Sequence, residues 1–453
     1  MTEVSLRDLT LCFEGAVPAV IATAAADGTP NITYLSRVRC VDDERVALSN
    51  QFFSKTQRNL AENPRASVLL VDPVSYEQYR LELAYERTER RGPIFEQLRA
   101  DVDMVAAYSN MQDVFKLRAA DIYRVLTIEL IPGVSIPSAE SPFAIEARAG
   151  AQGLAELTAR ISRSPDLDTI VTTTVNGLAE LLGFEHSTLL LLDEDGRRLF
   201  TIASHGYEAE GVGSEVVVGE GLVGTVAARG IPIRLGNVLQ IEKYSTSVAR
   251  AFEEHGELGP GYEIPVPGLP DAKSRIAVPA LALGELVAVL MVEDPRPVAF
   301  TEADEITLTV LAALVASAIE VERTREATEP ASASRTLAMR EPEPSTPTTH
   351  VRFFPVDGST FLDGDYLIKG VAGRILWSLL RHYEREQRVE FTNKEVRLDP
   401  SLELPEFRDN LDSRLLLLKR RLDERAAPIR IEKTGRGRFR LDVSTSLRLD
   451  EPQ

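Results

Sequence analysis

Apolar residues in the first third of the chain recur at every second position, which is the period of a strand buried on one face. Tyr79, Leu81, Leu83 and Tyr85 alternate in this way with charged or small residues. Further strand-like runs occupy residues 17–24, 31–40, 45–49 and 66–71, with an Asp27-Gly28 hairpin turn and a helical stretch at 54–62. Residues 1–135 therefore predict a small antiparallel barrel with one solvent-exposed face.

A second domain is predicted over residues 150–325, where helical and strand periods are mixed. Helical spacing occupies 154–161 and 170–182, and strand-like runs follow at 187–192 and 198–204. The last helix begins near Ala303 and carries Ile306, Val310, Leu314 and Val321 on one face. Because this face runs past the domain, we expect the helix to pair with that of a second copy and the chain to form a homodimer.

The last part of the chain begins with a segment that has no apolar period. Residues 326–350 are rich in Pro, Ser, Thr and Glu, a composition that predicts a flexible linker. Residues 351–445 then predict a small leading sheet, three helices at 370–386, 391–399 and 404–425, and a two-stranded hairpin at 429–443. In the third helix Leu411, Leu415, Leu418 and Leu422 form one core-facing stripe. The whole chain is thus predicted to be a multidomain α+β protein.

Composition argues against a metal-dependent function and against a membrane protein. The chain has 453 residues, 44% of them hydrophobic, which is enough for about three cores. It has two cysteines and five scattered histidines, so we expect no metal centre. No run of apolar residues is long enough for a membrane span and the first residues do not resemble a signal peptide, so we expect a cytoplasmic protein without membrane contact.

Charge is distributed unevenly along the chain. The formal net charge is -18, of which residues 1–350 carry -20 and residues 351–453 carry +2. Residues 413–440 contain 10 Lys and Arg against 3 Asp and Glu, which favours local contact with DNA phosphates. The candidate DNA-binding residues are Arg414, Lys419, Arg421, Arg425, Arg436 and Arg438. This interpretation requires those cations to be free of the protein's own carboxylates, and a solvated basic face or a protein-binding surface is the alternative.

Residues 15–132 resemble the pyridoxamine-phosphate oxidase-like, FMN-binding split barrels, through GAVPAVIATAAADGTPNITYLSRV and VALSNQFFSKTQRNLAENPRASVLLVDP. The resemblance implies FMN or a related flavin, its phosphate held by cations and hydroxyls near a helix start. The candidate cofactor-binding residues are Arg37, Arg39, Ser49, Asn50, Ser54, Lys55 and Thr56. The family commonly has Ser-Arg-Lys where this chain has Ser54-Lys55-Thr56, so one cation is missing. The alternative is that Ser54 only caps a helix and the arginines are solvated strand residues.

Residues 150–322 resemble the GAF family in the order and spacing of FEHSTLLLLDEDGRRLFTIASHGY, VVVGEGLVGTVAARGIPIRLGNV and RIAVPALALGELVAVLMVED. The resemblance implies a central antiparallel sheet with helices on one side and a pocket for a small-molecule ligand on the other. Gly219, Gly221 and Gly224 form a GxGxxG pattern, but no βαβ unit with a following acidic residue surrounds it. We therefore interpret these glycines as turn residues.

Residues 351–443 resemble the winged helix of response regulators, most specifically through Gly435-Arg436-Gly437-Arg438-Phe439. Three functions remain open at this point. The first is a ligand- or redox-responsive transcriptional regulator, the second a flavin-dependent oxidoreductase with accessory domains, and the third a protein-binding signalling adaptor. No catalytic residue is predicted, because no nucleophile stands beside a base in the sequence.

Overall fold

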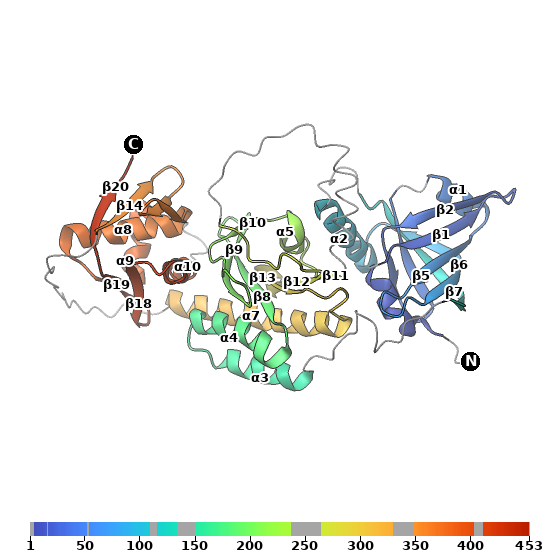
Figure 1. Cartoon of the computed structure of the whole chain (residues 1–453), viewed down its shortest axis with the longest axis horizontal. Helices are drawn as coiled ribbons and strands as arrows, with labels where there is room; N and C mark the ends of the chain where they lie inside the picture. Colours follow the sequence, from blue (N-terminus) through green and yellow to red (C-terminus); the bar gives the residue numbers. More distant parts are fainter. Residues whose placement is uncertain are drawn as a thin grey trace.

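The computed structural model describes residues 4–15, 17–51, 54–108, 116–133, 150–236, 264–328, 348–402 and 411–452. Three bodies follow one another in chain order, with the N-terminal barrel at one end and the C-terminal domain at the other (Figure 1). Most of the predicted linker 326–350 lies outside the described residues, as do residues 403–410 at the start of the predicted third helix. The multidomain α+β class is confirmed.

The N-terminal body is one antiparallel sheet of seven strands in the order β2-β1-β5-β6-β7-β4-β3. Its elements are η1 (Leu6–Glu14), β1 (Ala19–Ala24), β2 (Pro30–Leu35), β3 (Val38–Cys40), β4 (Arg45–Asn50), α1 (Ser54–Glu62), β5 (Arg65–Val71), β6 (Gln78–Glu89), α2 (Pro93–Tyr108) and β7 (Ala119–Ile131). The predicted alternation lies in β6, where Leu81 and Leu83 are buried in the barrel core. Strand β6 pairs with both β5 and β7, so it holds the centre of the sheet.

The middle body has a six-stranded antiparallel sheet in the order β10-β9-β8-β13-β12-β11. Its elements are α3 (Ala151–Ser162), α4 (Leu167–Leu182), β8 (His186–Leu192), β9 (Arg198–His205), β10 (Glu215–Val217), α5 (Gly221–Arg229), β11 (Ile233–Leu235), β12 (Ser274–Ala282), β13 (Glu285–Asp294) and α7 (Glu302–Thr328). Helices α3, α4 and α7 lie on one side of the sheet, and α5 lies on the other (Figure 1). Helix α2 of the barrel packs on α5, where Ala100 shares a buried cluster with Leu222 and Val226.

Local sequence signals fix where α4 begins and ends. The Asp166 carboxylate accepts a hydrogen bond from the Thr169 main-chain N–H at 2.9 Å, which satisfies a donor that has no partner within the helix. Gly183 ends the helix in the left-handed conformation with φ 74°, which glycine adopts without steric cost. This cap places Asp166 and Asp168 together at the positive end of the α4 dipole.

The C-terminal body combines two small sheets with three helices. The sheets have the strand orders β16-β15-β14-β20 and β17-β19-β18. The elements are β14 (Thr348–Phe354), β15 (Ser359–Leu362), β16 (Asp365–Ile368), α8 (Gly370–Glu386), β17 (Glu390–Thr392), α9 (Asn393–Arg397), η3 (Pro400–Leu402), α10 (Leu411–Glu424), β18 (Ile429–Gly435), β19 (Arg438–Val443) and β20 (Ser446–Asp450). Across the described ranges no helix is both long and apolar enough to cross a membrane.

Candidate functional site

The two arginines predicted to bind a flavin phosphate face a buried carboxylate of α2 instead. Arg39 donates to both carboxylate oxygens of Asp101, at 2.9 Å and 3.1 Å, and Arg37 Nε lies 3.6 Å from Asp101 Oδ2. The Asp101 side chain is only 2% exposed. Burial opposes its ionisation, but the neighbouring Arg39 and Arg37 hold the pKa of Asp101 below its usual range. This ion pair ties β3 and the residue before it to α2.

The same cluster of charges continues into the middle domain. Arg37 also donates to the main-chain oxygen of Glu14, and the Glu14 carboxylate pairs with Arg234 of β11. Arg234 Nε in turn donates to Glu305 of α7 at 3.0 Å. The barrel and the middle domain are therefore joined by buried ion pairs as well as by the packing of α2 on α5.

The remaining residues predicted for the flavin are mostly buried and bonded within the barrel. Ser49 Oγ accepts a hydrogen bond from the main-chain N–H of Arg37 at 3.0 Å, and Asn50 donates to Asp121 at 2.8 Å. Thr56 accepts from Asn31 at 3.0 Å, whereas Lys55 is exposed. The side chain of Ser54 lies outside the described residues.

These contacts decide how well the predicted set fits a flavin. A phosphate needs cations and hydroxyls that point to one open place. Here both guanidinium groups are engaged by Asp101 and two of the hydroxyls are bonded inside the barrel, which leaves Lys55 as the one predicted cation that is exposed. The set does not fit a flavin phosphate in this arrangement, and its assignment to a flavin stays a prediction.

The face of the GAF-like sheet that α5 covers carries a buried polar cluster. Glu293 of β13 accepts from Arg275 of β12 at 2.6 Å and from the Leu269 main-chain N–H at 2.9 Å. The Tyr207 hydroxyl lies against Thr188 and Glu293, and burial is the main cause that raises the pKa of Tyr207. Among the described residues neither the Tyr207 hydroxyl nor that of Thr188 has a partner in good hydrogen-bond geometry. Buried hydroxyls without well-aligned partners are costly, so this cluster is a candidate site of polar recognition in the domain.

The GxGxxG pattern lies at the junction between β10 and α5, as a set of tight turns. Gly219 and Gly221 have φ of 97° and 60°, a conformation that glycine adopts without strain. A side chain at Gly224 would place its first carbon 2.2 Å from the Val217 main-chain oxygen. Each glycine therefore has a backbone reason to be there, without any nucleotide.

Helix α10 is buried on two faces. The predicted stripe of Leu411, Leu415, Leu418 and Leu422 lies in the hydrophobic core of the C-terminal domain. The other face lies against the middle domain, and Arg414, Leu417, Arg420 and Glu424 each contact it. One face of α10 meets an apolar core and the other meets polar groups of the middle domain. The leucine run 415–418 and the three cations that follow it at 419–421 supply these two kinds of contact.

Five of the six predicted DNA-binding residues lie beside carboxylates of the same chain. Arg414 pairs with Glu194 and Lys419 with Asp168, both in the middle domain. Within the C-terminal domain, Arg421 donates to the Leu367 main-chain oxygen and to Glu424, and Arg425 pairs with Asp365. Arg436 lies 3.8 Å from Glu322 of α7 in the middle domain, and Arg438 stands opposite Thr392 in the pairing of β19 with β17. The requirement that these cations be free of the protein's own carboxylates is therefore not met on α10 in this arrangement.

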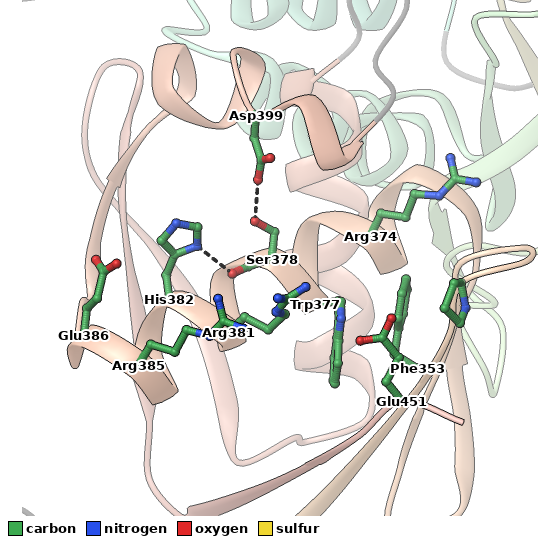
Figure 2. Close-up of a pocket in the computed structure, with 11 residues that line it drawn as sticks. Phe353, Arg374, Trp377, Ser378, Arg381, His382, Arg385, Glu386, Asp399 and Glu451 are labelled. Carbon is green, nitrogen blue, oxygen red and sulfur yellow. Dashed lines mark hydrogen bonds between the residues drawn. The ribbon is translucent and has the colours of Figure 1, made fainter. Parts of the chain in front are cut away.

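A groove of about 410 Å³ runs along α8 on the C-terminal domain. Phe353 and Trp377 stack in it with ring centroids 5.1 Å apart. Arg374, Arg381 and Arg385 lie along one side of α8, with Trp377 between the first two (Figure 2). The other residues of the groove are Pro355, Ser378, His382, Glu386, Asp399 and Glu451.

Hydrogen bonds in the groove show what chemistry it supports. The Ser378 hydroxyl donates to Asp399 at 2.6 Å, and His382 Nδ1 lies 2.9 Å from the Ser378 main-chain oxygen (Figure 2). Ser378 thus points to a carboxylate rather than to the imidazole, so these three residues are not arranged as a nucleophile with its base. The groove thus sets Arg374, Arg381 and Arg385 beside three carboxylates, and its two stacked rings are almost buried.

Sequence reasoning missed the α8 arginines and the polar cluster of the middle domain. Arg374, Arg381 and Arg385 are spaced by seven and then four residues, which places them on one helix face, and that spacing was visible in the sequence. Glu293 stands at the end of a buried apolar strand, which is an unusual place for a carboxylate. Its partners Tyr207 and Thr188 carried no such signal.

Two segments of the chain match models of known families. Residues 9–126 match the model described as pyridoxamine 5'-phosphate oxidase, and residues 164–320 match a model described as GAF domain. These matches confirm the resemblance of the first two domains, and neither covers the C-terminal domain. No curated protein matches the chain.

Solved structures are similar to parts of the chain. The GAF domain of an Acinetobacter phosphoenolpyruvate-protein phosphotransferase is 26% identical over 38% of this chain and 93% of its own, with a TM-score of 0.32. Free methionine-R-sulfoxide reductase of Neisseria meningitidis, in complex with its substrate, is 20% identical over 40% and 99%, with a TM-score of 0.30. An FMN-binding protein of Syntrophomonas wolfei is 15% identical over 28% and 84%, with a TM-score of 0.24. At these TM-scores the likenesses support no argument about function.

Arg39→Ala should destabilise the protein by about 3 kcal/mol, because it leaves the buried Asp101 carboxylate with a weaker partner. Since the pKa of Asp101 is lowered in the folded state, its contribution is present above its unfolded pKa of about 4 and is lost as the pH falls through the folded value. The loss of stability caused by Arg39→Ala should thus become smaller at low pH. Chemical denaturation at several pH values measures it, and Arg80→Ala on the exposed face of β6 is the control. A deficit equal to that of the control would contradict the structural role.

Proposed function

We propose that this chain is a sensory protein in which the barrel and the GAF domain control a C-terminal winged helix that binds DNA. The matches to the two family models support the sensory part. The observation that carries the output is the local excess of cations in residues 413–440 of an acidic chain, 10 Lys and Arg against 3 Asp and Glu. Because the α10 cations are paired with carboxylates in this arrangement, the proposal requires their release. A DNA-binding module needs such a local excess because phosphate contacts supply much of its affinity.

The signal in this proposal is a small molecule bound at the polar cluster of the GAF domain. Glu293 and Arg275 already neutralise one another, so the cluster carries no net charge. The hydroxyls of Tyr207 and Thr188 are each able to donate or accept a hydrogen bond. These groups favour an uncharged ligand with a hydroxyl or amide.

The C-terminal domain, expressed as residues 348–452 and checked for folding by circular dichroism, should bind duplex DNA with an affinity that falls steeply as salt rises. Arg381→Glu with Arg385→Glu should lower the slope of log affinity against log salt by about one per lost phosphate contact. Fluorescence anisotropy across a salt series measures both. Arg352→Glu with Arg448→Glu is the matched control, because both residues are exposed on the paired strands β14 and β20, and Arg352 lies on the opposite face of β14 from the groove residue Phe353.

A folded fragment without affinity for DNA even at low salt would contradict the DNA step. That result would favour the alternative in which the C-terminal domain binds other proteins and the chain is a signalling adaptor.

The homodimer belongs to the same proposal. Ile306, Val310 and Val321 of α7 are 58%, 52% and 50% exposed, and Ala313 and Ser317 continue this uncharged exposed stripe between them. Four turns of exposed helix without a charge are unusual on so acidic a chain, and a second α7 is an occupant of matching length and polarity. Pairing there would bring two C-terminal domains together.

Val310→Glu should convert the dimer to a monomer, because it places a charge at the centre of the proposed contact. The folded chain itself should keep its thermal stability, since Val310 makes little buried contact within it. Light scattering after size exclusion measures the mass. Val356→Glu, at a residue 95% exposed on the turn after β14, introduces the same change elsewhere and should leave the mass unaltered. Equal masses for the two variants and the wild type would count against pairing through α7.

A flavin-dependent oxidoreductase is the second candidate, and the family match over residues 9–126 is the observation that favours it. The engagement of Arg37 and Arg39 by Asp101 points the other way. We therefore expect the purified protein to be colourless and to take up no FMN on reconstitution. An absorption spectrum before and after incubation with FMN tests this, and a flavin band in either sample would favour the oxidoreductase.

A further inference from the structure

One face of α10 is docked on the GAF domain over its whole length. Arg414, Leu417, Arg420 and Glu424 are spaced by three, three and four residues, so they follow one side of the helix. Leu417 lies against Gly213, and Glu424 accepts a hydrogen bond from the Gly211 main-chain N–H at 2.9 Å. This face includes cations that the proposed function assigns to DNA.

The ion pair at the start of α10 is the most buried of these contacts. Arg414 donates to both carboxylate oxygens of Glu194, at 3.1 Å and 2.6 Å, and the two side chains are 14% and 10% exposed. The guanidinium also lies over the ring of Phe200, 4.5 Å from its centroid. A paired, stacked and desolvated arginine is held far more firmly than one in a surface salt bridge.

A second group of contacts surrounds the N-terminus of α4. Asp168 pairs with Lys419 at 2.8 Å and with Arg420 at 2.6 Å, and Asp166 pairs with Lys433 of β18 at 3.3 Å. Although burial opposes its ionisation, the bonds from Lys419 and Arg420 hold the pKa of Asp168 below its usual range. One short acidic segment thus holds both α10 and the hairpin.

We infer that Asp166, Asp168 and Glu194, here called the GAF clamp, form an interaction surface whose partners are α10 and β18 of the same chain. The clamp occupies cations of α10 and so keeps that helix from a nucleic-acid backbone. DNA phosphates and the clamp compete for one set of cations, and the GAF domain is the internal competitor. The clamp rests on contacts within the chain, whereas its effect on DNA rests on the proposed function.

The clamp also has a short connection to the candidate ligand site. Residues 206–214 form one loop after β9, with Tyr207 in the polar cluster at its start and Gly211 bonded to Glu424 of α10. A side chain at Gly211 would meet Pro265 and Pro267, which lead to Leu269 and its bond to Glu293. A ligand that moves Tyr207 therefore acts on a loop that α10 contacts directly.

Asp168→Lys with Glu194→Lys in the full chain tests the clamp, because both changes lie outside the proposed DNA surface. Repulsion from Arg414, Lys419 and Arg420 should release α10. Hydrogen–deuterium exchange of residues 411–424 should then rise while exchange of the sheet of the GAF domain stays unchanged. Affinity for a labelled duplex of random sequence at low salt should rise roughly tenfold. The matched control, here called the Glu180 control, is Glu180→Lys with Glu156→Lys, since it makes the same total charge change at two exposed residues that pair with Arg160 instead.

Restoring the charge pair separates release from misfolding. Arg414→Glu added to Glu194→Lys should return the exchange of α10 towards the wild-type rate. Unchanged exchange in the first double variant, or a rise equal to that of the Glu180 control, would overturn the clamp. Faster exchange of α10 without any gain in DNA affinity would leave the clamp standing and contradict the proposed DNA output.

Discussion

The arrangement of the chain depends on how the cations of α10 are shared. A guanidinium group that makes two short bonds to one carboxylate has little left to offer a phosphate, and burial strengthens that commitment by removing water. Arg414 is committed in this way to Glu194, and Arg420 donates a single bond to the Asp168 carboxylate at 2.6 Å. These contacts hold one face of α10 against the GAF domain.

Buried ion pairs also fix the junction between the barrel and the GAF domain. Asp101, Arg39 and Arg37 fix α2 within the barrel, and Glu14 pairs with Arg234 of the GAF domain. A buried ion pair adds little stability relative to an apolar one, yet it is costly to break, so its main effect is to select one geometry. Both ends of the GAF domain are thus joined to their neighbours by contacts that tolerate few intermediate positions. Such junctions favour transitions between two discrete states over gradual movement.

The sequence predicted the helices and strands better than it predicted the ion-pair partners of charged side chains. Period-two alternation in residues 79–85 and the leucine stripe of α10 follow from local geometry, so they were readable directly. The partner of Arg414 was not readable, because Glu194 lies 220 residues away and nothing in the spacing of either residue refers to the other. The same holds for Arg39 and Asp101, which lie 62 residues apart. Composition shows where cations lie along the chain, but only the fold shows whether they form ion pairs with carboxylates of the same chain.

The ion pairs seen in the fold give the acidic residues of the N-terminal part a more specific role than composition suggests. From composition alone, the charge of -20 on residues 1–350 acts only as a general repulsion of polyanions. In the folded chain, Asp166, Asp168 and Glu194 belong to that same acidic excess. Asp168 and Glu194 bind the basic helix α10 directly, and Asp166 binds Lys433 of β18. Local pairing of this kind is shorter in range and less screened by salt than a diffuse field. It is also switchable, because a shift of a few kcal/mol at a small set of contacts is the usual scale of coupling between two sites. If the candidate polar site of the GAF domain binds a ligand, a modest change there is enough to alter what the basic domain binds.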